Sequence, residues 1–262
     1  MEVCLHIGLH KTGTTSLQAL LEHNRARLGL DVAIFNHNSD ALMPVQRACL
    51  AFARNPGPET GAAISDRLAQ LLAAEAMRGR SKVLVSSEML SGPVPALHRK
   101  GPLGGHAVQI APWLRKAVEG FRAEFCLYIR DQERWLISLH AHLLRSRGIR
   151  LTRRAFLQRV ADQGFRIEEL AEATSAALGG AQVFRMEDEI ATRLGPGTGF
   201  LNLAGFDDAV LAELEPVAPQ NTGLSKQTVE RMEAPALLAL PAIARRYLAR
   251  IMDGQTEKRT SR

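Results

Sequence analysis

The stretch VCLHIGLHKTGTTSLQALLEH, residues Val3–His23, joins an apolar run to an amphipathic run through a glycine-containing turn. The first five residues are short and apolar, which predicts a buried β-strand over Val3–Ile7. Leucines recur at helical spacing further on, which predicts an α-helix over Thr14–Leu28. A strand, a glycine turn and a helix in this order present backbone N–H groups to an anion at the start of the helix.

The alternation of strand and helix continues along most of the chain. Further strands are predicted over Asp31–Asn36, Lys82–Ser87, Glu124–Ile129 and Gln182–Met186. Further helices are predicted over Ala41–Arg54, Ile64–Arg78, Ala107–Phe121, Asp131–Arg147, Thr152–Asp162, Ile167–Leu178 and Ser225–Met252. This order favours an α/β fold in which helices flank a central parallel sheet, giving a three-layer sandwich.

Length and composition fit a single globular domain. The chain has 262 residues, of which 46% are hydrophobic and 23% charged, values that suit one α/β domain with a sizeable core. We expect the domain to occupy residues 1–252 and the last ten residues, 253–262, to be a disordered tail. The three cysteines are too few and too widely spaced for a disulfide scaffold or a zinc site.

No apolar run reaches 18 residues, so we expect no membrane span. The first residues read as a strand without a basic region or cleavage site, and we therefore expect a cytoplasmic location. The net charge is +6, and residues 130–154 hold seven arginines against Asp131 and Glu133. Such a cluster indicates either an anionic ligand or a solvated basic surface. The basic excess is not accompanied by a basic stretch with regularly interleaved aromatic residues, so nucleic acid is not an expected partner.

The turn after the first strand differs from a nucleoside triphosphate loop in the position of its lysine. Gly8 and Gly13 have the spacing of the G-x-x-x-x-G-K-[ST] pattern, but Thr14 follows the second glycine and Lys11 precedes it. The loop is therefore poorly suited to Mg-ATP. Its hydroxyls and one ammonium suit a tetrahedral group joined to another through a bridging oxygen, on which Lys11 could stabilise developing charge. The simpler alternative is a helix start with threonine as the N-cap.

The residues from Lys11 to Thr15 resemble the 5′-phosphosulfate loop of sulfotransferases that use 3′-phosphoadenosine 5′-phosphosulfate (PAPS). That loop typically reads Pro-Lys-[Ser/Thr]-Gly-Thr-[Thr/Ser], and here His10 replaces the proline. The resemblance implies the P-loop-like sulfotransferase fold, PAPS as sulfuryl donor, no metal, and Lys11 as a catalytic residue. The residues it assigns to cofactor binding in this loop are Lys11, Thr12, Gly13, Thr14, Thr15 and Ser16.

A second family signature binds the 3′-phosphate through an arginine at a strand end and a serine eight residues later. Arg130 and Ser138 match it. Helical spacing puts Ser138 opposite the apolar side of its helix, and a guanidinium fork suits phosphate. The alternative is that Arg130 pairs with a carboxylate and Ser138 is an ordinary helix residue. The family's usual Arg-Lys-Gly loop is absent, and Lys226 in QNTGLSKQ is a candidate substitute.

Glu88 is the first candidate for the base that removes the acceptor's proton. It follows the strand Lys82–Ser87, and glycan-modifying members of the family carry a glutamate base in a comparable region. Its alternative roles are a helix N-cap or an ion pair with Lys82 or Arg115. Histidines are rivals, and His10, His98 and His106 are also candidates for acceptor binding. The last two lie in Gly92–Pro112, a predicted loop or lid rich in Gly, Pro and His.

Parallel strands deliver their carboxyl ends to one crevice, so Lys11, Glu88 and Arg130 are predicted to line it together. Glu187 in FRMEDE is interpreted as structural. The favoured function is transfer of the sulfuryl group from PAPS to a hydroxyl or amine of a small-molecule or glycan acceptor, with a carbohydrate or glycolipid preferred. The alternatives are a P-loop kinase using ATP and Mg²⁺ and a non-catalytic nucleotide-binding module. The sequence leaves the oligomeric state open.

Overall fold

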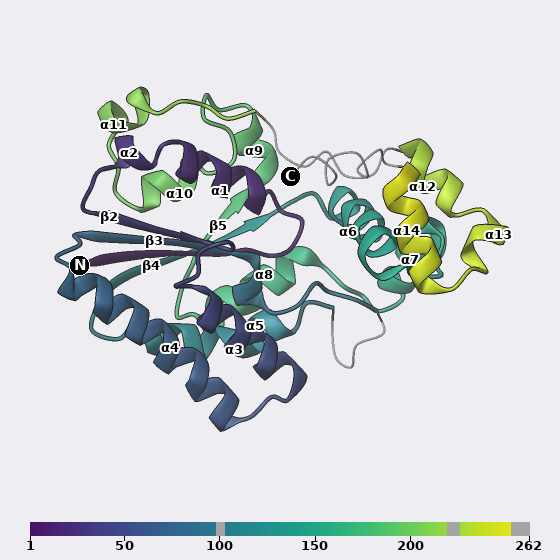
Figure 1. Cartoon of the computed structure of the whole chain (residues 1–262), viewed down its shortest axis with the longest axis horizontal. Helices are drawn as coiled ribbons and strands as arrows, with labels where there is room; N and C mark the ends of the chain where they lie inside the picture. Colours follow the sequence, from purple (N-terminus) through teal and green to yellow (C-terminus); the bar gives the residue numbers. More distant parts are fainter. Residues whose placement is uncertain (98–102, 219–225, 253–262) are drawn as a thin grey trace. The chain divides into compact units, whose positions relative to one another are not determined.

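The computed structural model describes residues 1–97, 103–218 and 226–252 (Figure 1). These residues group into two compact units. The first is built from residues 1–95, 103–131 and 166–218 and holds the sheet. The second is built from residues 96–97, 132–165 and 226–252 and is helical. The predicted tail and His98 lie outside the described residues.

The first unit contains a five-stranded sheet in the order β2-β3-β1-β4-β5, with every pair parallel. Its strands are β1 (Glu2–Ile7), β2 (Val32–Asn36), β3 (Lys82–Ser87), β4 (Arg122–Ile129) and β5 (Gln182–Arg185). In the central strand, Leu5 lies opposite Val85 of β3 and Phe125 of β4. Apolar runs form the buried strands β1 and β3 and the buried second half of β4, as a parallel sheet requires, whereas the edge strand β5 is largely exposed. The predicted central parallel sheet flanked by helices is confirmed.

Helices cover both faces of this sheet (Figure 1). On one side lie α1 (Thr14–His23), α2 (Arg25–Leu28), α9 (Met186–Ile190), α10 (Thr198–Leu203) and α11 (Asp208–Glu213). On the other lie α3 (Met43–Arg54), α4 (Pro58–Met77), α5 (His106–Ala117) and α8 (Ile167–Ala177), while the short helix η1 (Glu88–Ser91) follows β3. Cys4, Leu84 and Cys126 pack with Leu17 and Phe200 against the α1 side. Alternate strand residues therefore face the opposite helices, and the layers are consistent with a three-layer sandwich.

The helix predicted over Thr14–Leu28 is wrong at Asn24, where the structure separates α1 from α2. Asn24 is fully buried, and its side-chain amide donates to the backbone oxygens of Leu20 and Glu215. Its Oδ1 accepts the N–H of Glu215 at 2.8 Å. An asparagine side chain that bonds to backbone in this way competes with the helical ladder. The break therefore depends on a segment nearly two hundred residues away in sequence.

The second unit consists of α6 (Gln132–Arg147), α7 (Arg153–Ala161), α12 (Lys226–Met232), α13 (Pro235–Leu238) and α14 (Ala242–Met252). The single helix predicted over Ser225–Met252 is wrong, because Pro235 and Pro241 interrupt it. Buried Arg245 donates to the backbone oxygens of Leu238, Leu240 and Gly148. These bonds join α14 to the end of α6 and satisfy carbonyls that the broken helices leave open.

Candidate functional site

The loop between β1 and α1, residues 8–13, lies at the carboxyl end of the central strand. The chain leaves this strand toward β2 and β3 on one side and later reaches β4 and β5 on the other. Ligands of open parallel sheets bind at such a reversal of strand order, beyond the carboxyl ends of the strands. The sheet topology therefore puts the loop at the position where a ligand is expected.

Two residues of the loop adopt left-handed backbone conformations. Lys11 has φ 72°, the only non-glycine residue with positive φ in the described part of the chain, and Gly13 has φ 92°. A Cβ on Gly13 would also lie 3.2 Å from the Met186 sulfur. The N–H groups of Ser16 and Leu17 bond to the Gly13 oxygen and begin α1. Strained backbone of this kind concentrates at functional sites, and here it shapes the turn that carries the lysine.

The threonines of the loop differ in their surroundings. Thr12 is fully buried and donates its hydroxyl to the Leu9 oxygen, so it holds the turn together. Thr14 is also buried, and its hydroxyl has no hydrogen-bond partner among the described residues. That hydroxyl lies 2.7 Å from where a Cβ on Gly8 would stand, so Gly8 permits the close approach. Thr15 and Ser16 are half-buried. An unsatisfied buried hydroxyl is uncommon and indicates a polar partner.

His10 is buried and packs inside the loop rather than outward. Its Nε2 donates to the Gly92 oxygen at 2.9 Å, which ties the loop to the segment after η1. Burial lowers the pKa of His10, while the Gly92 hydrogen bond and the Glu88 carboxylate oppose that shift and the Lys11 ammonium adds to it. Glu88 and Lys11 are therefore both close enough to His10 to act on it electrostatically at this edge of the sheet.

Glu88 follows β3 directly and begins η1, in which Ser87 is the N-cap and accepts the N–H of Met89. The Gln18 side chain, buried on α1, donates to the Ser86 oxygen at 2.8 Å and to Glu88 Oε2 at 3.3 Å. Lys82, one of the alternative partners considered for Glu88, pairs instead with Glu2 at the far end of the strand. The carboxylate is therefore held from the side by an amide.

Gln18 and His37 are residues that the sequence reasoning missed. His37 follows β2 and donates its Nδ1 proton to the Gln18 oxygen. The result is a chain of hydrogen bonds from His37 through Gln18 to Glu88, spanning the carboxyl ends of β2 and β3. Gln18 was detectable as a polar residue beside the apolar stripe of α1, whereas nothing local to His37 marks it.

His106 begins α5, and its Cβ would lie 3.0 Å from a Cβ on Gly92. Because Gly92 also accepts the bond from His10, the structure brings these two histidines to the same short segment. The loop predicted over Gly92–Pro112 is only partly correct, since α5 starts at His106.

Arg130 lies at the end of β4 and is partly buried, with its Nε 3.8 Å from Glu187 Oε1. That Nε has no hydrogen-bond partner among the described residues, while the same Glu187 oxygen accepts the N–H of Asp131 at 3.2 Å. The carboxylate thus faces Arg130 without taking up its hydrogen-bonding capacity. Ser138 belongs to the second unit, where it is half-buried on α6.

A buried polar group supports the sheet beneath the loop. His6 on β1 is fully buried, bonds to the Ser86 hydroxyl at 2.9 Å, and lies edge-on to the Tyr128 ring at 5.2 Å. Tyr128 donates to Glu189, whose carboxylate also accepts the N–H groups of Gly197 and Gly199, both at 2.7 Å. Burial raises the pKa of Glu189, and these hydrogen bonds oppose that shift.

The buried His6 makes stability depend on pH. Burial lowers the pKa of His6 to about 3, whereas the unfolded chain takes up that proton near the ordinary value of about 6.5. The unfolded state binds more protons between these values, so stability falls as pH drops below about 6.5, by up to ~1.4 kcal/mol per unit for this one group. Urea unfolding of wild type and His6→Gln from pH 7.5 to 4.5 is expected to show a shallower decline for the variant.

Ser86→Ala is the matched control for that measurement. It removes the same His6–Ser86 hydrogen bond but keeps the titrating ring, so it should lower stability at every pH without flattening the decline. Parallel curves for wild type and His6→Gln would contradict the assignment of this pH dependence to His6.

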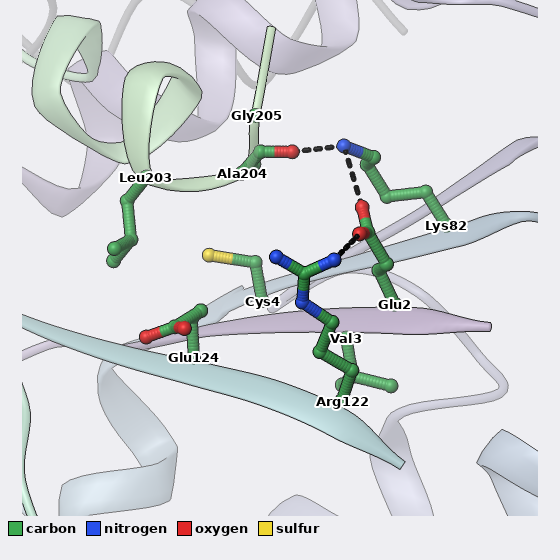
Figure 2. A pocket seen from close by; sticks show the side chains of 9 residues that line it. All are labelled: Glu2, Val3, Cys4, Lys82, Arg122, Glu124, Leu203, Ala204 and Gly205. Atoms are coloured by element: carbon green, nitrogen blue, oxygen red, sulfur yellow. Dashed lines mark hydrogen bonds and ion pairs between the residues drawn. The ribbon is translucent and has the colours of Figure 1, made fainter.

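Figure 2 shows a hollow at the opposite end of the sheet from the loop, where β1, β3 and β4 begin. Glu2 bonds there to Lys82 at 3.2 Å and to Arg122 at 3.0 Å, and hydrogen bonding to Lys82 chiefly lowers the pKa of Glu2. Lys82 also donates to the Ala204 oxygen. The hollow has a volume of about 80 Å³, well below the ~300–1,000 Å³ of typical ligand sites. The charged side chains of the hollow are paired with one another. They link the starts of the strands, and we do not regard the hollow as a ligand site.

Comparison with known proteins identified no matching family model and no matching curated protein. In the described part of the chain, no helix is both long enough and apolar enough to cross a membrane. The same residues contain no cluster of three or more His, Cys, Asp or Glu side chains suited to a metal ion. All three cysteines are free and buried.

Proposed function

We propose that this protein is a PAPS-dependent sulfotransferase, which transfers a sulfuryl group to a hydroxyl or amine acceptor without a metal. The observation that carries the proposal is the arrangement around Lys11. A strained lysine stands at the tip of a glycine turn on the central strand, and Glu88 follows the adjacent strand at the same edge. A positive charge for the donor and a base for the acceptor are the two groups that this reaction needs.

The residues of the loop fit the phosphosulfate group. The start of α1 supplies N–H groups without intrahelical partners and a partial positive charge. Gly8 lets the loop backbone approach closely, and the Thr14 hydroxyl has capacity for a polar partner. PAPS, when bound, supplies the sulfuryl group. Lys11 would hold its ammonium against the bridging oxygen, where negative charge grows as the bond to sulfur breaks.

Arg130 fits the 3′-phosphate of the same molecule. Its guanidinium is partly exposed, and its Nε makes no hydrogen bond to a described residue. A planar fork of N–H donors matches phosphate oxygens. Glu187 would then orient the guanidinium, which agrees with the structural role that the sequence suggested for this carboxylate. Ser138 stays a prediction as the second phosphate ligand.

Glu88 would accept the proton of the attacking acceptor group. Gln18 donates to Oε2 of the carboxylate, which leaves the other oxygen for the acceptor. The amide fixes the direction of the carboxylate, and His37 fixes the amide in turn. On the family resemblance, a glutamate base favours a carbohydrate or glycolipid acceptor. His10 of the loop and His106 of α5 both lie at Gly92 and are the histidine candidates for contact with that acceptor.

Ligand binding tests the proposal against its two alternatives. We expect calorimetry to give a dissociation constant for adenosine 3′,5′-bisphosphate at least about tenfold lower than for ATP with Mg²⁺, a difference of ~1.4 kcal/mol. Incubation with PAPS and a panel of hydroxyl and amine acceptors should then release the bisphosphate. Tighter binding of Mg-ATP would favour a kinase. Bisphosphate binding without turnover on any acceptor would favour a non-catalytic nucleotide-binding module.

A further inference from the structure

The second unit contains its own cavity, formed at α6, at α7, in the turn between them and at Ala96 and Leu97. Its volume is about 320 Å³, at the lower end of the range for sites that bind small molecules. Leu143, Leu151 and Phe156 contribute apolar side chains, and Leu143 and Phe156 are almost fully buried. The interior of the cavity therefore suits a short hydrocarbon or aromatic group.

The same cavity is lined by charge of a single sign. Arg147, Arg150 and Arg159 contribute to it, and all three are exposed. In the part of the chain that the structure describes, no Asp or Glu lines the cavity and none forms an ion pair with these arginines. Three uncompensated guanidinium groups repel one another, so an anion between them would relieve that repulsion. Guanidinium forks also match the oxygens of sulfate, phosphate and carboxylate groups.

We propose that this cavity binds a small amphipathic anion, with its apolar part against Leu143, Leu151 and Phe156 and its anionic head group on the arginines. The two halves of the lining have opposite preferences, so neither a free inorganic anion nor a neutral hydrocarbon satisfies both. The inference concerns the second unit alone and does not depend on the proposed sulfotransferase activity.

Octyl sulfate tests the proposal. 1-Octanol probes the apolar part of the cavity alone, and inorganic sulfate probes the arginines alone. We expect calorimetry at low salt to show octyl sulfate binding at least about tenfold more tightly than either probe. Added salt should weaken it, because the arginines are exposed. The double variant Arg147→Ala/Arg150→Ala should lose about fivefold in affinity, and Leu151→Ala should lose affinity for octyl sulfate but not for sulfate.

Arg154→Ala is the matched control, because Arg154 is an exposed arginine on α7 that does not line the cavity. It should bind octyl sulfate as wild type does. Equal weakening by this variant, equal affinity for sulfate alone, or equal affinity for octanol would each overturn the proposal. A second measurement needs no variant: the methyl resonances of Leu143 and Leu151 should shift when octyl sulfate is added, and unshifted resonances would refute the site.

Discussion

Replacing Lys11 with methionine is expected to slow sulfuryl transfer from PAPS by about 10²–10³-fold, the usual effect of removing one group that stabilises transition-state charge. Methionine keeps most of the side-chain length but carries no charge. It also keeps the left-handed backbone at a similar cost, since lysine and methionine are both unbranched at Cβ and meet a similar steric penalty there. The free energy of unfolding should therefore change little, as urea titration would show.

Lys116→Met is the control for Lys11, because it removes an exposed lysine from the last turn of α5. It should leave the transfer rate within twofold of wild type, a change of roughly 0.4 kcal/mol in activation free energy. Transfer at a near-wild-type rate by Lys11→Met would show that the ammonium does not act on the breaking bond. A rate loss accompanied by unfolding would be visible in the same urea titration and is not expected.

Replacing Glu88 with glutamine is expected to lower kcat by about 10²–10⁴-fold, the usual contribution of a general base. Glutamine has nearly the same shape, and its side-chain oxygen can still accept the Gln18 amide at the position of Oε2. Affinity for adenosine 3′,5′-bisphosphate should stay the same, since Glu88 is assigned to the acceptor and not to the donor. Steady-state kinetics and calorimetry on one preparation separate the two effects.

Glu119→Gln is the matched control, because it removes an exposed carboxylate after α5 without touching the loop edge. The variant should keep the wild-type kcat. An unchanged kcat in Glu88→Gln would show that Glu88 is not the general base. One of the histidines would then be the candidate, and His10 and His106 both lie at Gly92. Loss of bisphosphate affinity would instead indicate that Glu88 supports the donor loop.

The strands and the loop were predictable because local patterns determine them. Short apolar runs that are bounded by turn residues favour buried strands, and the spacing of Gly8 and Gly13 marks the turn. The left-handed φ of Lys11 was not predictable, because lysine has no preference for it. The same holds for Thr12, whose hydroxyl turns inward to the Leu9 oxygen instead of toward a ligand.

Features that depend on distant segments escaped the sequence reasoning. Asn24 ends α1 because Glu215 approaches it, and Gln18 reaches Glu88 only because α1 packs beside the end of β3. Neither contact leaves a periodic or compositional trace. Pro235 and Pro241, which separate the three helices after Lys226, are visible in the sequence. The prediction of one continuous helix followed the apolar spacing and did not allow for these two prolines.

The backbone at position 11 has a bearing on how the protein could be redesigned. A method that chooses residues for stability alone would place glycine there, gaining about 1–2 kcal/mol by relieving the left-handed strain, and would delete the ammonium in doing so. Natural proteins commonly accept such a local loss of stability where activity requires it. Position 11 is therefore a place where optimising this protein for thermal tolerance and preserving the proposed chemistry call for opposite choices.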